Sequence, residues 1–211
     1  MMAKSPAKTS ARSTGTGNSR KQILDIAAAL FSQRGYNGTP LRDIAAAANM
    51  KAGSLYYHFD SKEQLILEVL QIGINNIRES AVKSVAALPA ESSSREVLIA
   101  AAKGHLEALL EKGDYASTSI RNYRQVPDAI QDVVVKIRNS YEDLWRQWLA
   151  DAQEKGEIKA EVNLKILRLA ILSALNRVLE WYTEGEELTV HEIAEIQMGF
   201  FLDGVGLEVA D

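Results

Sequence analysis

Apolar residues recur three or four positions apart through most of the chain after residue 18. In residues 19–36 they stand at positions 23, 26, 27, 30 and 31, which places them on one face of a helix. Asn18 or Ser19 can cap the start of that helix, and Gly35 is typical of a helix end. No stretch alternates apolar and polar residues for long enough to predict a strand. The pattern predicts an all-α protein of about nine helices.

The next three predicted helices have recognisable start signals. Thr39 is predicted to cap the second helix, because the proline that follows it fits the first helical position. Asn49-Met50 interrupts this helix, and a short third helix follows at about residues 52–58. The sequence Ser61-Lys62-Glu63-Gln64 is a capping-box pattern, which predicts the start of a long fourth helix.

A polar linker at residues 88–94 divides the pattern, and five more helices are predicted beyond it. They lie at about residues 95–112, 115–124, 128–154, 163–183 and 189–205. We therefore expect three parts: a disordered basic arm at residues 1–17, a three-helix head at residues 18–64, and a larger helical-bundle body at residues 65–211.

Charge is distributed unevenly between these parts. Residues 1–60 hold eight Lys or Arg against three Asp, whereas the remainder holds 16 basic against 25 acidic residues. A basic head on an acidic body indicates that a polyanion binds at one end. The alternative is a basic tail that biases the count, because Lys4, Lys8 and Arg12 precede the first periodic segment.

Composition narrows the class of protein further. The chain has no cysteine, 46% hydrophobic residues and 25% charged residues, which is typical of a globular protein in a reducing compartment. No apolar run approaches the roughly 20 residues that span a bilayer, and no apolar stretch follows the basic N-terminus. We therefore expect a cytoplasmic protein with no membrane partner. The three histidines lie far apart, and no phosphate loop, HExxH or GxSxG motif occurs, so no catalytic residue, metal site or cofactor is predicted.

Residues 39–59 hold the candidate functional motif. Two short helices joined by a tight turn form a unit that can place its second helix in the major groove of DNA. That groove is about 12 Å wide, so the second helix needs small and polar residues facing outward. Residues 51–58 meet this requirement, while Leu55 and Phe59 are spaced to turn back toward Ile44 and the first helix. The sequence predicts a helix-turn-helix in the head.

The same residues carry a family resemblance. The runs ILDIAAALF at residues 23–31, RDIA at 42–45 and GSLYYHF at 53–59, with Gly35-Tyr36, Thr39 and Ser61-Lys62-Glu63, resemble in register the N-terminal signature of the TetR/AcrR family. The resemblance covers about residues 19–66. It implies a transcriptional repressor that binds a double-stranded DNA operator as an Ω-shaped homodimer and is nucleoid-associated when bound. It also implies that the body binds a small-molecule effector and moves the two heads, with the fourth helix as the expected lever.

The resemblance and the motif together predict the DNA-contacting residues. They are Thr39, Arg42, Lys51, Ala52, Gly53, Ser54, Tyr56, Tyr57, His58 and Lys62. Three alternatives stay open: one of the two tyrosines packs on the first helix, Arg42 pairs with a carboxylate such as Asp25, or His58 serves as a cap. Arg12, Arg20 and Lys21 reach a groove or only add charge.

The last two long helices are the predicted dimer interface, and two of them from each subunit would form a four-helix contact. Their apolar stripes comprise Leu164, Leu167, Ile171, Leu175, Val178, Ile193, Ile196, Phe200 and Phe201. The alternative is that one stripe belongs entirely to the core of its own subunit.

The effector site is predicted from aromatic and polar residues of the body, a mixture that small-molecule sites use. The predicted residues are Tyr115, Arg121, Tyr123, Arg124, Trp145, Trp148, Asn176, Arg177 and Trp181, with His105, Ser119, Asn122, Tyr141 and Tyr182 as further candidates. The stretch 174–182 resembles a subset of the family whose members respond to acyl-coenzyme A thioesters, although the Pro-Gly usual after it is missing. An acyl-CoA or related acid is therefore expected as effector, with the three arginines as its partners.

Each of these residues also has an ordinary structural interpretation, as a core aromatic or a surface arginine. Two other functions remain open from the sequence. One is a helical protein-interaction module without DNA binding, and the other is a regulator that needs a corepressor.

Overall fold

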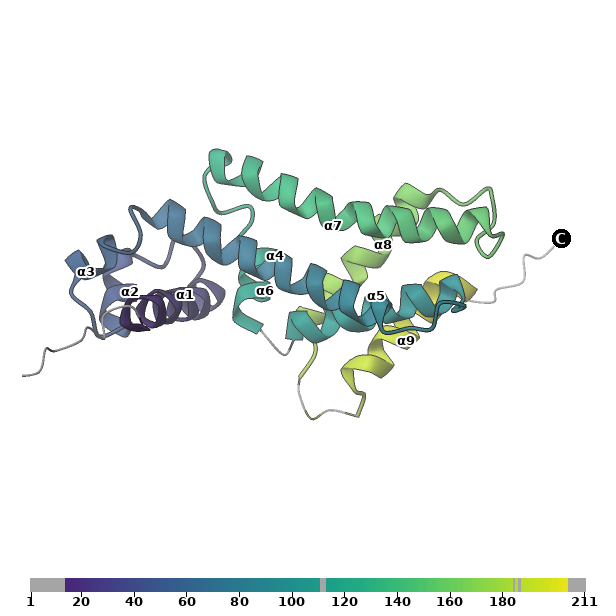
Figure 1. Cartoon of the computed structure of the whole chain (residues 1–211), viewed down its shortest axis with the longest axis horizontal. Coiled ribbons are helices and arrows are strands. Elements are labelled where there is room, and N and C mark those ends of the chain that lie inside the picture. Colours follow the sequence, from purple (N-terminus) through teal and green to yellow (C-terminus); the bar gives the residue numbers. More distant parts are fainter. Residues whose placement is uncertain (1–13, 111–112, 184, 186, 205–211) are drawn as a thin grey trace, which may run out of the picture.

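The computed structural model describes residues 14–110, 113–183, 185 and 187–204, and all regular secondary structure within them is helical (Figure 1). The prediction of an all-α fold is confirmed. The predicted arm falls mostly on residues 1–13, which lie outside the described residues. The helices are α1 (Thr14–Arg34), α2 (Leu41–Ala47), α3 (Ala52–Tyr56), α4 (Lys62–Ala86), α5 (Ser94–Leu110), α6 (Gly113–Arg121), α7 (Asp128–Glu154), α8 (Leu164–Arg177), the 3₁₀-helix η1 (Val178–Glu180) and α9 (Val190–Asp203).

Several helix ends differ from the predicted ones. α1 begins at Thr14 instead of Asn18 or Ser19, because extending an existing helix adds one hydrogen bond for each residue and is easier than starting one. α3 ends at Tyr56, before the predicted residue 58. The predicted single helix at residues 163–183 is α8 followed by the tighter turn η1.

The head consists of α1, α2 and α3 packed around one apolar core. Ile23, Phe31, Ile44, Leu55 and Phe59 are all buried there, so the prediction that Leu55 and Phe59 turn inward is confirmed. The turn between α2 and α3 contains Asn49 at φ 53°, a left-handed conformation that asparagine tolerates better than most residues. The three helices thus form a helix-turn-helix unit.

Two helix starts show how capping works in the head. Ser61 caps α4 as predicted, and its side chain accepts a hydrogen bond from the Gln64 amide at 3.1 Å. The prediction that Thr39 caps α2 is wrong, because the cap position is Pro40. Thr39 is fully buried, and its hydroxyl donates to the carbonyl oxygens of Gly35 at 2.8 Å and Leu30 at 3.3 Å. Its hydroxyl therefore closes the end of α1.

The head core continues into the body. α4 runs from the head along the length of the molecule (Figure 1), and its buried residues Leu65, Ile66 and Leu70 belong to the same cluster as Phe31. Val126 and Val134, from the start of the α7 region, also join that cluster. The head therefore shares its apolar core with the first part of α4 and α7.

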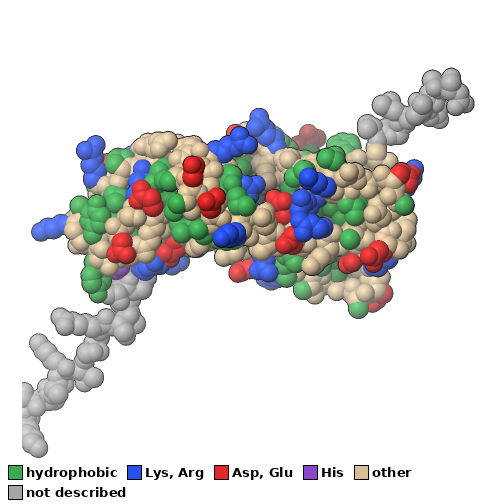
Figure 2. Space-filling model, turned by 90° about the horizontal axis from the view of Figure 1, so that it is seen from above, with side chains coloured by type: hydrophobic (Ala, Val, Ile, Leu, Met, Phe, Trp, Pro, Cys, Tyr) green, Lys and Arg blue, Asp and Glu red, His purple; other side chains and the backbone are tan. Residues whose placement is uncertain are grey.

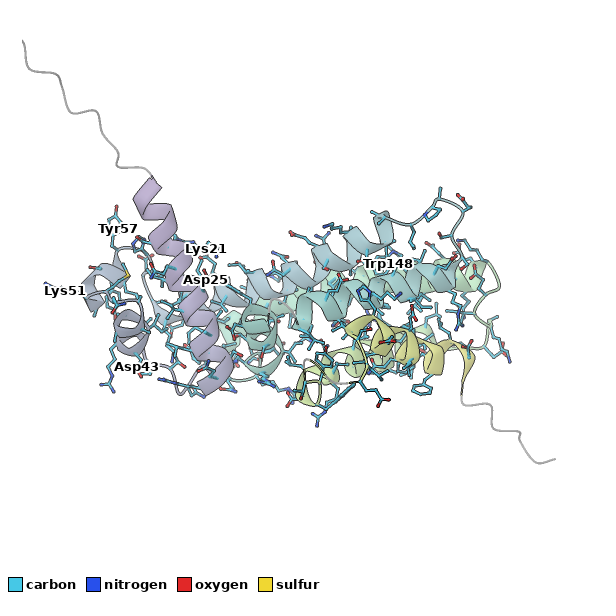
Figure 3. All side chains as sticks on the ribbon, turned by 90° about the horizontal axis from the view of Figure 1, so that it is seen from below. Lys21, Asp25, Asp43, Lys51, Tyr57 and Trp148 are labelled. Atoms are coloured by element: carbon cyan, nitrogen blue, oxygen red, sulfur yellow. The ribbon has the colours of Figure 1, made fainter. Side chains whose placement is uncertain are left out.

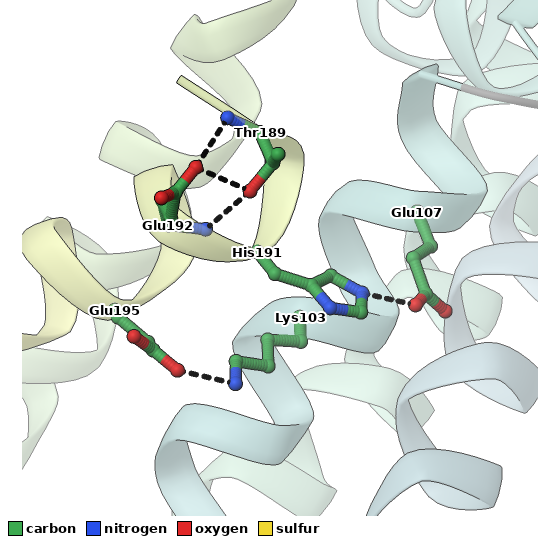
Figure 4. A network of polar contacts seen from close by, with 6 residues as sticks. All are labelled: Lys103, Glu107, Thr189, His191, Glu192 and Glu195. Atoms are coloured by element: carbon green, nitrogen blue, oxygen red, sulfur yellow. Dashed lines mark hydrogen bonds and ion pairs between the residues drawn. The ribbon is translucent and has the colours of Figure 1, made fainter.

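The body has a second core, formed mainly by α5, α7, α8 and α9 around the fully buried Trp145. Polar contacts hold α9 against α5 (Figure 4): Lys103 pairs with Glu195 at 2.5 Å, and His191 pairs with Glu107. Thr189 starts α9 with a capping box. In the described part of the chain, no helix is both long and apolar enough to cross a membrane.

Candidate nucleic-acid interface and body cavity

The short helix α3 presents its side chains to solvent at the end of the head. Residues 51–54 are exposed, and the exposed fraction is 53% for Tyr56 and 78% for Tyr57. Figure 3 shows Lys51 and Tyr57 at the end of the molecule farthest from Trp148, and Figure 2 shows basic side chains standing out from the same end. Leu55 anchors the helix from beneath at 1% exposure. One face of α3 is therefore fixed, and the other is free for a partner.

Tyr56 of α3 and Tyr57, which directly follows it, both point outward, so the alternative in which one packs on α1 is wrong. Tyr57 instead meets His58 edge to face, with ring centroids 5.2 Å apart. The ring of His58 is half-buried beside it. This contact gives the exposed tyrosine a preferred position on the surface.

Arg42 is also available at this surface. Its side chain is 85% exposed, and it pairs with the neighbouring Asp43 at 3.4 Å instead of Asp25. Asp25 is occupied by Lys21 at 2.6 Å and by the Tyr115 hydroxyl at 2.8 Å. An exposed ion pair of this kind contributes little free energy, so Arg42 can exchange its partner at small cost.

Two residues predicted to contact DNA have hydrogen-bond partners within the protein. Thr39 is buried, as described above. Lys62 donates to the Tyr36 carbonyl at 2.5 Å and lies 4.0 Å from the centre of the Tyr36 ring. Burial lowers the pKa of Lys62, with the charge of Glu63 acting in the opposite direction. Lys62 therefore fixes the loop after α1 to the start of α4.

Arg20, one of the basic residues near the N-terminus, has partners within the protein. Arg20 forms a two-pronged ion pair with Glu68 on α4, and its guanidinium lies 4.6 Å from the centre of the Phe59 ring. The hydrogen bond to Glu68 is the main reason that the pKa of Arg20 is raised. Arg20 thus joins α1 to α4, while Arg12 lies outside the described residues.

A row of side-chain hydrogen bonds ties α6 and the turn after it to α1. The Thr118 hydroxyl donates to the Ala28 carbonyl at 3.0 Å, and Ser32 donates to Ser117 at 3.1 Å. Asn122, which is 1% exposed, donates to the Phe31 carbonyl at 3.1 Å and accepts from the Tyr36 amide at 2.7 Å. Together with the Tyr115–Asp25 bond, these contacts make α6 a polar link between body and head.

The body contains a partly enclosed cavity of about 100 Å³ between five helices. Its lining combines aliphatic residues with histidine, tyrosine, arginine, glutamate, serine and asparagine side chains. The lining residues are Ile74, Ile77, His105, Ser119, Ile120, Arg138, Tyr141, Glu142, Leu172 and Asn176. This mixture is typical of small-molecule sites.

Of the nine residues predicted for an effector site, Asn176 lines this cavity. The other eight are placed elsewhere, and those predictions are wrong for this cavity. Trp145 is in the core with Trp148 packed against it; Arg121 pairs with Glu180 at 3.1 Å; Tyr115 binds Asp25; Tyr123 lies under Arg138; and Arg124, Arg177 and Trp181 are exposed. Aromatic and arginine content alone did not separate core and surface positions from cavity positions.

His105, 2% exposed, stands at the centre of a hydrogen-bonded chain in the cavity wall. Its Nδ1 lies 2.9 Å from the Tyr141 hydroxyl, and its Nε2 lies 3.3 Å from Asn176 Oδ1. Burial lowers the pKa of His105 to about 4 and raises that of Tyr141. Both groups are therefore neutral near pH 7, and the chain is held by uncharged hydrogen bonds.

Arg138 and Glu142 are cavity residues that the sequence analysis missed. They stand four positions apart on α7, a spacing that is common for charged pairs on exposed helix faces. In the structure Glu142 pairs instead with the buried Arg168 of α8 at 3.1 Å, while the guanidinium of Arg138 lies 4.8 Å from the centre of the Tyr123 ring. The pairing partner on another helix carries no signal in the local sequence.

The predicted dimer residues are divided between core and surface. Ile171, Leu175, Val178 and Ile193 are buried in the body core, and Leu164, Leu167 and Phe201 pack against it. Ile196 and Phe200 remain exposed, at 43% and 62%. The prediction is therefore wrong for the buried four, because the strongest apolar stripe of a helix turns toward its own core.

Large apolar side chains remain exposed on both α8 and α9, two of them from the predicted dimer set and two outside it. They are Ile166 at 61%, Leu169 at 42%, Ile196 and Phe200. We call these four residues the α8/α9 face. Such a group of exposed apolar side chains is typical of a protein-interaction surface.

Comparison with known proteins places this architecture. A model described as "Tetracyclin repressor-like, C-terminal domain" matches residues 91–205, more than half of the chain, and one described as "Bacterial regulatory proteins, tetR family" matches residues 23–69. The chain belongs to the TetR family. The family consists of transcriptional regulators and not of enzymes. The family resemblance is therefore confirmed, and membership agrees with the prediction that the chain is not an enzyme.

One relative is similar over nearly its whole length. The chain is 28% identical over 200 residues to the HTH-type transcriptional repressor KstR2 of Rhodococcus jostii, an alignment that covers 91% of this chain and 93% of the relative. The curated relatives that match thus include a named repressor.

Solved structures share the fold. AibR in complex with isovaleryl coenzyme A and operator DNA matches with a TM-score of 0.76 at 23% identity, covering 87% of this chain and 98% of AibR. The ketosteroid transcriptional regulator KstR2 of Mycobacterium tuberculosis also matches with a TM-score of 0.76 at 23% identity, covering 90% and 95%. At these identities the likeness concerns the fold.

Proposed function

We propose that this TetR-family protein is a transcriptional repressor that binds a palindromic double-stranded DNA operator as a homodimer and is released by a small-molecule effector. The observation that carries the proposal is the orientation of α3. Leu55 and Phe59 hold it from beneath, while its polar and aromatic side chains face solvent at the end of the head. A short helix held in this way fits the major groove.

The proposed DNA contacts are a revised form of the predicted set. They comprise Arg42, Lys51, Ala52, Gly53, Ser54, Tyr56, Tyr57 and His58, without the occupied Thr39 and Lys62. Gly53 supports this assignment, because a Cβ atom added there would meet no protein atom within 4 Å. The protein's own packing does not require a glycine at this position, whereas close approach of a DNA backbone would.

The α8/α9 face supports the dimer. Burying Ile166, Leu169, Ile196 and Phe200 against the same face of a second copy would remove four large apolar side chains from water on each side. Two heads joined in this way bind two half-sites, and the second contact becomes intramolecular. We therefore expect half-sites about one helical turn of DNA apart, roughly 34–36 Å.

Release by an effector is supported by the position of α6. Ser119 of α6 lines the cavity, while Thr118 and Asn122 hold the end of α1. α4 is closely packed on α6 at Gly73, where a Cβ atom would clash with the Tyr115 carbonyl. An effector that prefers a shifted α6 would weaken operator binding by the ratio of its affinities for the two states. In this proposal α4 and α6 act together as the lever.

The effector is proposed to be an acyl-CoA or a related acid, in line with the resemblance of residues 174–182 and with the ligand named in the AibR structure. We also propose that the protein acts in the cytoplasm, on the nucleoid, because its target is DNA.

The decisive experiment is selection of an operator from a random pool of double-stranded DNA, followed by fluorescence anisotropy at several salt concentrations. We expect a complex that weakens steeply with salt. Replacing both Lys51 and Tyr57 by alanine should weaken operator binding by at least about 100-fold, since each base or phosphate contact is worth about 1–3 kcal/mol and occurs twice in a dimer.

Lys159→Ala, which removes an exposed lysine from the body, is the matched control and should leave affinity unchanged. All variants should unfold at the temperature of the unmodified protein. An absence of any salt-sensitive DNA complex would favour a protein-interaction module. If the double variant bound the operator as tightly as the unmodified protein, α3 would not be the recognition helix.

A further inference from the structure

We propose that the body cavity binds a short aliphatic acyl or carboxylic acid group, that the Asn176 amide donates hydrogen bonds to its oxygen, and that His105 holds this amide in place. The proposal rests on the proposed function only in calling the ligand an effector. Binding to the cavity itself is independent of DNA.

The hydrogen-bonded chain in the cavity wall has one consistent direction. Asn176 Oδ1 has no hydrogen, so His105 Nε2 must be the donor in the 3.3 Å contact. A neutral imidazole carries one hydrogen, and therefore Nδ1 accepts from the Tyr141 hydroxyl at 2.9 Å. Since burial keeps His105 neutral, this arrangement is fixed. The Asn176 oxygen is therefore already hydrogen-bonded to His105, and its NH₂ group is left to bond a ligand in the cavity.

The uncommitted polar groups of the cavity are mostly donors. Among the described residues, none accepts a hydrogen bond from Asn176 Nδ2, and Arg138 has its contact with the Tyr123 ring but no carboxylate partner. Ser119 has already donated its hydroxyl hydrogen to the Ala116 carbonyl at 2.7 Å. A ligand group with oxygen acceptors satisfies the amide and the guanidinium together.

The charge around the cavity points to the same chemistry. Glu142 is the acidic residue of the lining, and its charge is compensated by Arg168 at 3.1 Å. The positive charge of Arg138 is left without a counterpart in the lining. An anion or a polarised carbonyl is therefore favoured over an amine.

The volume of the cavity limits the size of the ligand group. In another protein a cavity of about 150 Å³ binds benzene, and the cavity of this chain is smaller, at about 100 Å³. By the same measure it takes about four non-hydrogen atoms. The branched or straight chain of a small acid fits, supported by Ile74, Ile77 and Leu172, whereas a ring system does not.

The test is isothermal titration calorimetry of the DNA-free protein with a series of acids. The series is butyric, isovaleric, hexanoic, cyclohexanecarboxylic and a fused bicyclic carboxylic acid, each as free acid and as coenzyme A thioester. The four- and five-carbon members should bind at least about tenfold more tightly than the two ring acids. The difference between acid and thioester shows whether the ligand is the free acid or its carrier-bound form.

Substitutions at two positions, Asn176 and His105, test the polar contacts. Asn176→Asp keeps the shape of the side chain but removes its donors, so it should weaken isovaleryl binding at least about tenfold. Asn139→Asp, an identical change at an exposed position of α7, is the matched control and should bind normally. His105→Leu should weaken binding similarly, whereas His105→Gln, which can still donate to Asn176, should restore affinity to within about threefold.

Three outcomes would overturn the proposal: no binding by any member of the series, equal binding of ring and short-chain acids, or full affinity in Asn176→Asp. A protein that binds the short acids but no DNA would keep this proposal and remove the proposed function. A protein that binds DNA but none of the acids would remove the cavity proposal and keep the proposed DNA binding.

Discussion

The head and the body cavity use opposite arrangements of functional side chains. In the head, one short helix of five residues and the residues directly beside it, 51–58, carry most of the candidate contacts, and they face outward from a core that lies beneath them. In the cavity, five helices each contribute one to three residues, and these face inward. An exposed DNA-contacting helix needs only buried residues that hold it in place from beneath. An enclosed site depends on the relative positions of all the helices that line it. The body is therefore more sensitive to buried polar changes than the head.

The largest expected effect concerns the proposed dimer. Phe200→Glu places a charge in the proposed α8/α9 face and removes a phenyl ring that is 62% exposed in the single subunit. Because a two-fold interface contains the residue twice, the dissociation constant of the dimer should rise by at least about 100-fold. Sedimentation equilibrium should show monomers. Operator affinity should fall as well, because a monomer contacts only one half-site. Val133→Glu, at an exposed position of α7, is the control and should remain dimeric. If Phe200→Glu also remained dimeric, the α8/α9 face would be excluded as the dimer interface.

A smaller effect should appear in the pH dependence of body stability. The pKa of His105 is lowered to about 4 in the folded chain, while an unfolded histidine titrates near 6.5. Between these values the unfolded chain binds a proton that the folded chain does not, so the free energy of unfolding should decrease as pH falls from about 6.5 to 4.

The loss from this one residue should approach about 3 kcal/mol, because each pKa unit corresponds to about 1.4 kcal/mol. Guanidinium unfolding at a series of pH values should show it, and His105→Gln should flatten the curve in that window. A curve of equal slope in the variant would mean that His105 is not the responsible group.

The smallest effect distinguishes two positions within the head. Thr39→Val removes a buried hydroxyl that donates to the Gly35 carbonyl, and should lower the free energy of unfolding by about 1 kcal/mol. Operator affinity should change by less than about threefold, because the side chain does not reach the surface. Ser54→Ala, at an exposed position of α3, should show the reverse: unchanged stability and weaker DNA binding. If Thr39→Val weakened DNA binding more than Ser54→Ala, the hydroxyl would have to be reassigned to the interface.

The sequence predicted the head better than the cavity for a physical reason. The Ser61 cap, the Asn49 turn and the spacing of Leu55 and Phe59 are local signals, and each acts within a few residues. His105, Arg138 and Asn176 come together only when α5, α7 and α8 pack. Helical periodicity also identified the apolar stripe of α8, but it did not separate the core residue Leu175 from a dimer contact.

Thr39 and Lys62 show a limit even within the head. Both stand where the family motif suggests contacts with DNA, yet Thr39 closes the end of α1 and Lys62 binds the Tyr36 carbonyl. Their partners lie in the loop at residues 35–39 and depend on its folded path. A motif gives the position of a residue in the chain but not which neighbour takes its hydrogen bonds.

The shared core of the head has a consequence for exchanging parts between regulators. A graft that joined residues 18–64 to a foreign sensor would leave behind Val126 and Val134, which pack into the same cluster as Phe31. It would also lose Asn122, which holds the Tyr36 amide. A functional chimera of this protein must therefore carry its own α6–α7 turn and the first half of α4, so that what is transplanted is a three-dimensional unit and not a continuous piece of sequence.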